Sequence, residues 1–158
     1  PCGATSWPRA VTCSATNSRS CSPAMNRRRI RTVPATAADA RQFLAKALEY
    51  LATATSCLDA GHWTAATGNA IHAGINAADA LCARHRGVRA TGTDHAVSGD
   101  LLIGIPDGNR PAEAYRRLVA NKARAEYEPA PVSRALAQRC VRWATVLVDA
   151  AQAAFEQD

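Results

Sequence analysis

A polar strip on one predicted helix is the first group of residues suited to chemistry. Asn69, His72, Asn76, Asp79 and Arg86 form a narrow strip at helical spacing, and its first three members are uncharged or near-neutral. Short amides and an imidazole suit a shallow pocket or an interface, because an ordinary solvated face on this chain would carry Glu, Arg and Lys. Two interpretations therefore stay open for this strip, a binding surface and a solvated face.

A basic stretch farther along the chain is the second group. Residues 110–124 hold five cations against the single acid Glu113, and Glu126 and Tyr127 follow directly. Cations beside an aromatic ring are typical of a surface that contacts phosphates and stacks on bases. Cations near a helix end also complement the helix dipole, which is the alternative interpretation. The five cations are Arg110, Arg116, Arg117, Lys122 and Arg124.

Metal and cofactor chemistry finds little support in the residue spacing. No two histidines stand four residues apart, and Cys82 with His85 forms only half of a metal site. There is no Cys-x-x-Cys pair and no glycine-rich phosphate loop. We therefore predict no metal and no cofactor, cysteines packed as small buried hydrophobes, and a reducing cytoplasmic location.

Helical elements must position these residues. Thr36 and Asp39 form a candidate capping box ahead of an apolar stripe that runs to about Leu58, with Gly61 as the stop. A second, mostly apolar helix is predicted over 63–86 and ends at Gly87. Its small residues, with glycines at 68 and 74, should let neighbouring helices approach closely.

Three further helices complete the predicted fold. A short one is expected over 94–103, another from Pro111 to the Pro-rich break at 128–131, and the last from near Pro131 to Phe155. No β pattern is evident. The sequence thus predicts an all-α, mostly antiparallel bundle of four to five helices over residues 35–158.

Composition sets the remaining bounds. The 158 residues suffice for one core, and no run of 18 apolar residues is present, so we expect a soluble chain without a membrane span. Residues 1–34 carry six Arg and no acid, which predicts a disordered basic segment. It is either upstream sequence ahead of a start at Met25 or near Val33, or an arm that contacts nucleic-acid phosphates.

The order of several motifs resembles the HEPN (higher eukaryotes and prokaryotes nucleotide-binding) family. The motifs are the Gly- and Ala-rich helix of 61–81, then Gly92-Thr-Asp-His95, then Arg124-Ala-Glu-Tyr127 before a long final helix. The resemblance covers roughly residues 36–157. It implies a helical bundle, a homodimer, association with RNA or a nucleotide, and a toxin–antitoxin or defence locus with a nucleotidyltransferase or antitoxin partner.

Many members of that family are metal-independent ribonucleases whose signature is an Arg followed four to six residues later by His. Here no His follows Arg124, and only Arg89 with His95 has that spacing. We therefore predict binding without catalysis through Lys122, Arg124, Glu126, Tyr127 and the Asn69–His72–Asn76 strip. One alternative is an endoribonuclease with His95 as acid–base and Arg89 or Arg124 stabilising charge. Another is a structural helical protein that binds a partner.

Overall fold

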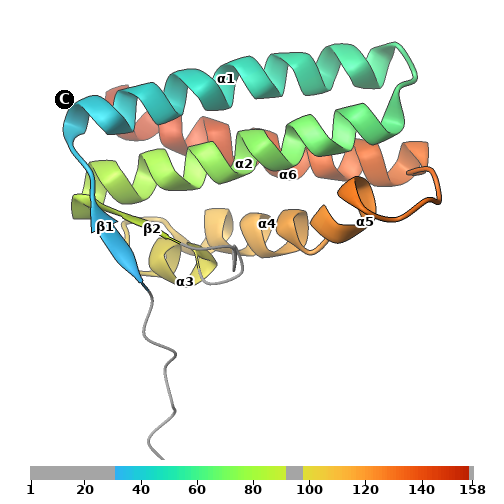
Figure 1. The fold of residues 1–158 in the computed structure, drawn as a ribbon. Coiled ribbons are helices and arrows are strands. Elements are labelled where there is room, and N and C mark those ends of the chain that lie inside the picture. The colour runs from blue at the N-terminus through green and yellow to red at the C-terminus, as the bar shows by residue number, and fades with distance from the viewer. Residues whose placement is uncertain (1–30, 92–97, 157–158) are drawn as a thin grey trace, which may run out of the picture.

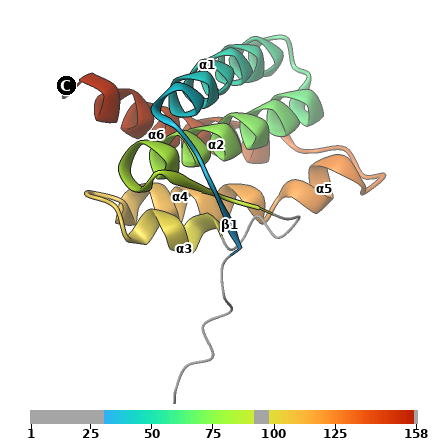
Figure 2. The ribbon, with the colours of Figure 1, turned by 60° about the vertical axis from the view of Figure 1, so that its left-hand side comes forward.

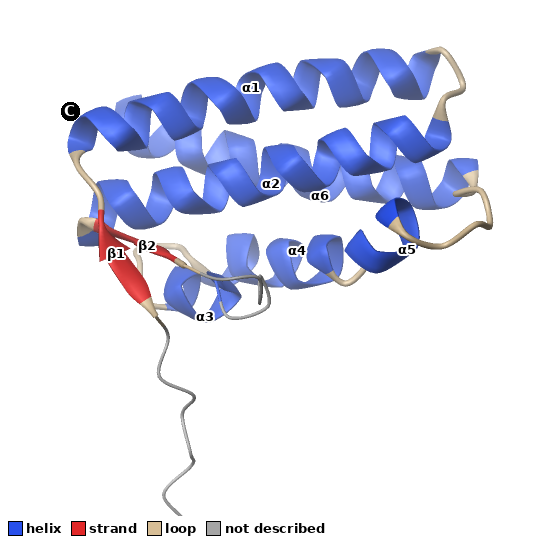
Figure 3. Cartoon of the chain, viewed as in Figure 1, coloured by secondary structure: helices blue, strands red, loops and turns tan. Residues whose placement is uncertain are grey.

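A bundle of helices forms the body of the molecule in a computed structural model that describes residues 31–91 and 98–156 (Figures 1 and 3). The all-α prediction is confirmed, with one small two-stranded ribbon added. The elements in chain order are β1 (Thr32–Pro34), α1 (Ala37–Asp59), α2 (Trp63–Arg86), β2 (Val88–Ala90), α3 (Ser98–Ile103), α4 (Asn109–Val119), α5 (Lys122–Glu126) and α6 (Arg134–Glu156).

Helix α2 is the centre of the bundle. It packs against α1, α6 and α4, and α1 also packs on α6 (Figures 1 and 2). Helices α1 and α2 run in opposite directions, as do α4 and α6 (Figure 1). The short helices α3 and α5 lie on the same side of α2 as α4, away from α1. Among the described residues, no helix is long and apolar enough to cross a membrane.

Local sequence signals explain where the long helices begin and end. The Thr36 side chain accepts a hydrogen bond from the Asp39 backbone N–H at 3.1 Å, and the Asp39 carboxylate accepts one from the Thr36 N–H at 2.8 Å. This is the predicted capping box. Gly61 and Gly87 follow α1 and α2 with φ of 79° and 64°, a left-handed conformation that glycine adopts without steric cost. Both predicted helix ends are confirmed.

Small residues let the helices of this core approach closely. A Cβ built on Gly74 of α2 would overlap the Leu118 side chain of α4 and lie 3.1 Å from Leu147 of α6. The predicted role of Gly74 in close packing is therefore confirmed. The same prediction is wrong for Gly68, because no heavy atom lies within 4 Å of a Cβ at that position. The largest fully buried side chains include Tyr115, Ile71, Leu102, Leu118, Leu147 and Val148.

The ribbon of β1 and β2 is the main departure from the predicted fold. The strands are antiparallel, with Val33 opposite Arg89. Hydrogen bonds of 2.9 Å flank the ribbon, from Ala35 N–H to the Gly87 carbonyl and from Thr91 N–H to the Arg31 carbonyl. The prediction of disorder through residue 34 is thus wrong for 32–34, whereas residues 1–30 lie outside the described part. Each strand has only three residues, too few for an alternating pattern to emerge.

The segment from α3 to α6 differs in its helix boundaries from the prediction. The single helix expected between Pro111 and residue 128 is two helices, because the chain turns at Ala120 and Asn121. The Asn121 side-chain amide donates to the Arg117 carbonyl at 2.8 Å, which satisfies an acceptor at the end of α4. Ahead of α4, Gly108 packs so closely on the turn after α3 that a Cβ there would overlap the Leu102 carbonyl oxygen. The expected start of α3 at residue 94 lies outside the described residues.

Candidate nucleic-acid interface

The surface of α5 carries the predicted basic and aromatic residues. This short helix has no buried residue, although it contacts α2 through its inner side. Tyr127, directly after α5, is 78% exposed, and Arg124 is exposed as well. We call Lys122, Arg124, Glu126 and Tyr127 the α5 surface. The structure therefore places three of these predicted residues on α5 and the exposed Tyr127 directly after it.

Charges on the α5 surface are arranged around Glu126. Its carboxylate lies 3.9 Å from the Lys122 Nζ, and its hydrogen bond and negative charge raise the pKa of the Tyr127 hydroxyl. Tyr127 therefore stays a neutral phenol at physiological pH. No ion pair or hydrogen bond engages the Arg124 guanidinium within the described residues. That cation remains available to a phosphate.

Three of the five predicted cations lie within ion-pair distance of nearby carboxylates, one of them Lys122 beside Glu126. On α4, Arg116 pairs with Asp100 of α3 at 2.7 Å, and Arg117 pairs with Glu113 one turn earlier at 2.8 Å. Both pairs are largely exposed, so each contributes little stability. They nevertheless reduce the basic character of α4, so that Arg110 and Arg124 are the exposed cations of this set without an ion pair among the described residues.

The described contacts of the polar strip of α2 are with α2 itself and with α1. The amides of Asn69 and Asn76 donate to the carbonyls of Ala65 and His72 at 2.9 and 2.8 Å. The His72 ring stacks on Tyr50 of α1, with centroids 5.2 Å apart. The strip thus lies along the α1 side of α2, and its amides still offer their carbonyl oxygens to a ligand.

Arg89 occupies a different place from Arg124. It lies on β2, directly after the C-terminal end of α2, with its guanidinium 5.9 Å from the Phe43 ring centroid. It also interacts electrostatically with Asp39 and Asp79. The segment after α5, by contrast, meets the first turn of α2, since the Val132 N–H lies 3.4 Å from the Thr64 hydroxyl. The structure therefore sets Arg89 and Arg124 toward opposite ends of α2 (Figure 1), and His95 lies outside the described residues.

Asp79 belongs to the predicted polar strip but is not among the predicted site residues. It is half-buried on α2, and burial raises its pKa from 3.8 to about 6 despite the opposing charge of Arg89. Carboxylates with a perturbed pKa gather at functional sites more often than elsewhere. Its place in the same strip of α2, one turn beyond Asn76, is the sequence signal that could have identified it.

Buried polar groups surround Asp79 where α2, α3 and α4 meet. The Tyr115 side chain is fully buried, and within the described residues its hydroxyl makes no hydrogen bond of ordinary geometry. Burial raises its pKa, and the nearby Ser98 hydroxyl opposes that rise. Burial also raises the pKa of the Cys82 thiol to about 12, so Cys82 is protonated and unreactive. Cys82 and Cys140 are buried and Cys57 half-buried, and all three are free thiols.

Replacement of Asp79 with asparagine is expected to stabilise the fold at neutral pH. The folded pKa exceeds the unfolded one, so ionising Asp79 lowers stability as the pH rises from about 4 to about 6. Asp79→Asn should raise the free energy of unfolding by about 2 kcal/mol at pH 7 and change it little at pH 4. Urea unfolding at several pH values measures this, with Asp59→Asn on the exposed end of α1 as the control. Equal changes in the free energy of unfolding at pH 4 and pH 7 would contradict a destabilising charge on Asp79.

Neither metal-ligating side chains nor comparison with other proteins indicates a function for this chain. The residues that the structure describes contain no group of three His, Cys, Asp or Glu side chains placed to hold a metal ion. Comparison of the chain with protein-family models and with curated proteins finds no match.

Proposed function

We propose that this chain is a HEPN-like protein that binds single-stranded RNA through the α5 surface without cleaving it. The observation that carries the proposal is the exposure of Tyr127, which is 78% exposed three residues after the exposed Arg124. Uncovered aromatic rings next to cations are the usual platform for unpaired bases and their phosphates, with stacking worth about 1–3 kcal/mol per base. The order of motifs that resembles the HEPN family supports the same class of ligand.

Binding is favoured over cleavage by the surroundings of the two candidate catalytic arginines. Phosphate cleavage requires an acid–base group and a cation around one phosphate. Arg89 is already near the carboxylates of Asp39 and Asp79, and its guanidinium lies over Phe43. Arg124 belongs to α5, toward the other end of α2. A catalytic centre would therefore use only one of the two arginines, and Arg89 already has two carboxylates and a ring as neighbours.

Substitutions on the α5 surface are expected to weaken RNA binding in two distinguishable ways. Tyr127→Ala should raise the Kd for a fluorescein-labelled 12-nucleotide oligouridine about 10-fold at every salt concentration, because stacking is lost. Arg124→Gln should weaken binding most at low salt and reduce the slope of log K against log salt by about one, because one phosphate contact is lost. Fluorescence anisotropy measures both.

Matched variants make this experiment decisive. Tyr127→Phe keeps the ring and should bind as the unaltered protein does, and Arg142→Gln removes an exposed α6 charge away from α5. Absence of RNA binding by the unaltered protein would refute the proposal and favour the structural alternative. If a mononucleotide displaces the oligouridine completely, the ligand is a nucleotide. Shortening of the RNA would favour the endoribonuclease, and His95→Ala should then abolish cleavage.

Assembly and location belong to the same proposal. An Ala-rich core contains few large side chains, so burial of a further face against a second copy would stabilise the fold. We expect sedimentation at micromolar concentration to give twice the monomer mass, and a monomer would contradict the homodimer. The free thiols of Cys57, Cys82 and Cys140 suit the reducing cytoplasm. A nucleotidyltransferase or antitoxin partner is proposed from the resemblance alone.

A further inference from the structure

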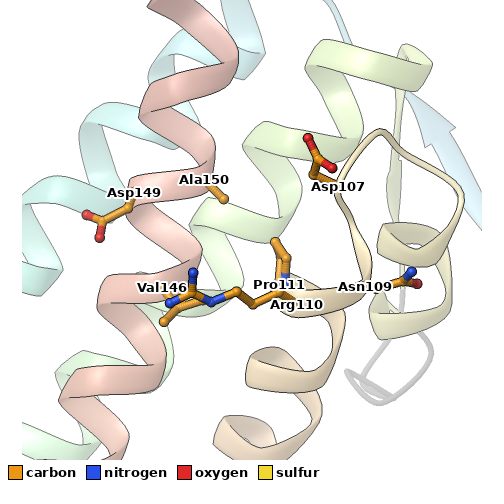
Figure 4. A pocket seen from close by; sticks show the side chains of 7 residues that line it. All are labelled: Asp107, Asn109, Arg110, Pro111, Val146, Asp149 and Ala150. Atoms are coloured by element: carbon orange, nitrogen blue, oxygen red, sulfur yellow. The ribbon is translucent and has the colours of Figure 1, made fainter.

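A cavity between α4 and α6 lies on a different part of the molecule from the α5 surface (Figure 4). Its volume is about 560 Å³, within the range of small-ligand sites. Pro111, Val146 and Ala150 form an apolar floor, and they are buried or half-buried. A floor of this kind suits methylene groups.

The polar side chains around this floor have no partner in the described part of the protein. Arg110 extends from α4 across to α6 beside Val146, while Asp107 and Asp149 stand on opposite sides of the floor (Figure 4). None of the three forms an ion pair, although the neighbouring Arg116 and Arg117 both do. Asn109 also lines the cavity. The cavity thus presents one cation and two anions, each able to accept a ligand group.

We propose that this cavity binds a cationic zwitterion, either a free basic amino acid or the basic carboxyl-terminal residue of a peptide. The free amino acid carries two cations and one carboxylate, which mirrors the one cation and two anions of the site. The carboxyl-terminal residue of a peptide keeps the side-chain cation and the carboxylate, whereas its α-nitrogen is an uncharged amide. The carboxylate of either ligand meets the Arg110 guanidinium in the bidentate geometry that arginine favours. The side-chain cation of either ligand meets Asp149, and its methylene chain covers the floor. The α-ammonium of the free amino acid also meets Asp107.

The two sources of this chemistry differ in what precedes the basic residue. A second hollow of about 240 Å³ adjoins the cavity and shares Arg110 and Val146 with it. Ala114 and Trp143 supply its apolar lining, and the paired Glu113 and Arg117 form its polar lining. The residues ahead of a peptide's carboxyl terminus would occupy this hollow, whereas a free amino acid would leave it to solvent.

Isothermal titration calorimetry of the full chain tests the site with L-lysine and the tripeptide Gly-Gly-Lys. Both ligands should bind, and tighter binding of the tripeptide identifies the peptide as the source. Norleucine, which lacks the side-chain ammonium, and lysine amide, which lacks the carboxylate, should each bind about 10-fold more weakly than lysine. Equal affinities for norleucine and lysine would overturn the proposal. So would the absence of a heat of binding with both lysine and the tripeptide.

Variants assign the contacts to named side chains. Asp149→Asn should weaken lysine about 10-fold and leave norleucine unchanged, while Arg110→Gln should weaken lysine and leave lysine amide unchanged. Asp59→Asn and Arg41→Gln, which alter exposed charges on α1, should match the unaltered protein. All four positions are exposed, so circular dichroism should show unchanged helicity. Equal lysine affinity in Asp149→Asn and Asp59→Asn would overturn the site, whereas RNA binding tests the separate α5 surface.

Discussion

Replacement of Leu118 with alanine is expected to lower the free energy of unfolding by about 3 kcal/mol. Leu118 is fully buried on α4 and packs against the backbone of α2 at Gly74. Loss of its side chain removes buried apolar surface and leaves a cavity, which together cost about 2–5 kcal/mol in well-packed cores. Denaturant unfolding followed by circular dichroism measures the change. Loss of less than 1 kcal/mol would show that α4 does not seal the core.

A second substitution tests whether this contact is specific to Gly74. Gly74→Ala alone should destabilise the fold by about 1–2 kcal/mol, because its methyl group would overlap Leu118 and crowd Leu147. In the double variant the new methyl group enters the cavity that Leu118→Ala leaves. The double variant should therefore be at least 1 kcal/mol more stable than the two separate effects predict. Simple additivity would contradict the proposed contact.

Replacement of Gly108 with alanine is expected to destabilise the protein by about 3 kcal/mol. Its backbone has an ordinary φ of −69°, so conformational strain is not the cause. The added methyl group would overlap the Leu102 carbonyl oxygen, which belongs to the backbone and cannot rotate away. The turn between α3 and α4 would have to open, at the upper end of the usual cost of overpacking.

Gly68→Ala is the matched control for this prediction. Its Cβ would meet no atom within 4 Å, and Gly68 lies inside α2. Alanine is more favourable than glycine within a helix by about 1 kcal/mol, so Gly68→Ala should stabilise the fold. Thermal unfolding of both variants measures the two opposite shifts. An unchanged melting temperature for Gly108→Ala would contradict the close contact at the turn.

The long helices could be predicted because their signals are local. The Thr36–Asp39 capping box and the glycines at 61 and 87 lie within a turn of the ends they define. The ribbon could not be predicted, since Val33 and Arg89 are brought together only after α1 and α2 have packed. The break between α4 and α5 was missed for a related reason. Nothing in the residues around Ala120 opposes a helix, and the position of α5 depends on its contact with α2.

The candidate-site residues also divide into those that local sequence indicates and those whose role depends on packing. Tyr127 and Arg124 could be identified from adjacency in the chain, and the structure places both on the surface. Asp79 could be placed on a helical face, but its raised pKa depends on burial by neighbouring helices. The cavity between α4 and α6 could not be predicted at all. It joins Arg110 to Asp149, residues whose proximity follows only from the packing of two helices.

The β1–β2 ribbon has a consequence for the order in which the chain can acquire its structure during synthesis. Residues of β1 leave the ribosome before those of β2. The partner strand follows only after the whole of α1 and α2 has been made. The ribbon therefore cannot close before that helical hairpin is complete. Once closed, it ties the entry of the hairpin to its exit, through the hydrogen bond between Ala35 and Gly87. Closure of the ribbon is thus possible only once the first half of the molecule has been made, from β1 to β2.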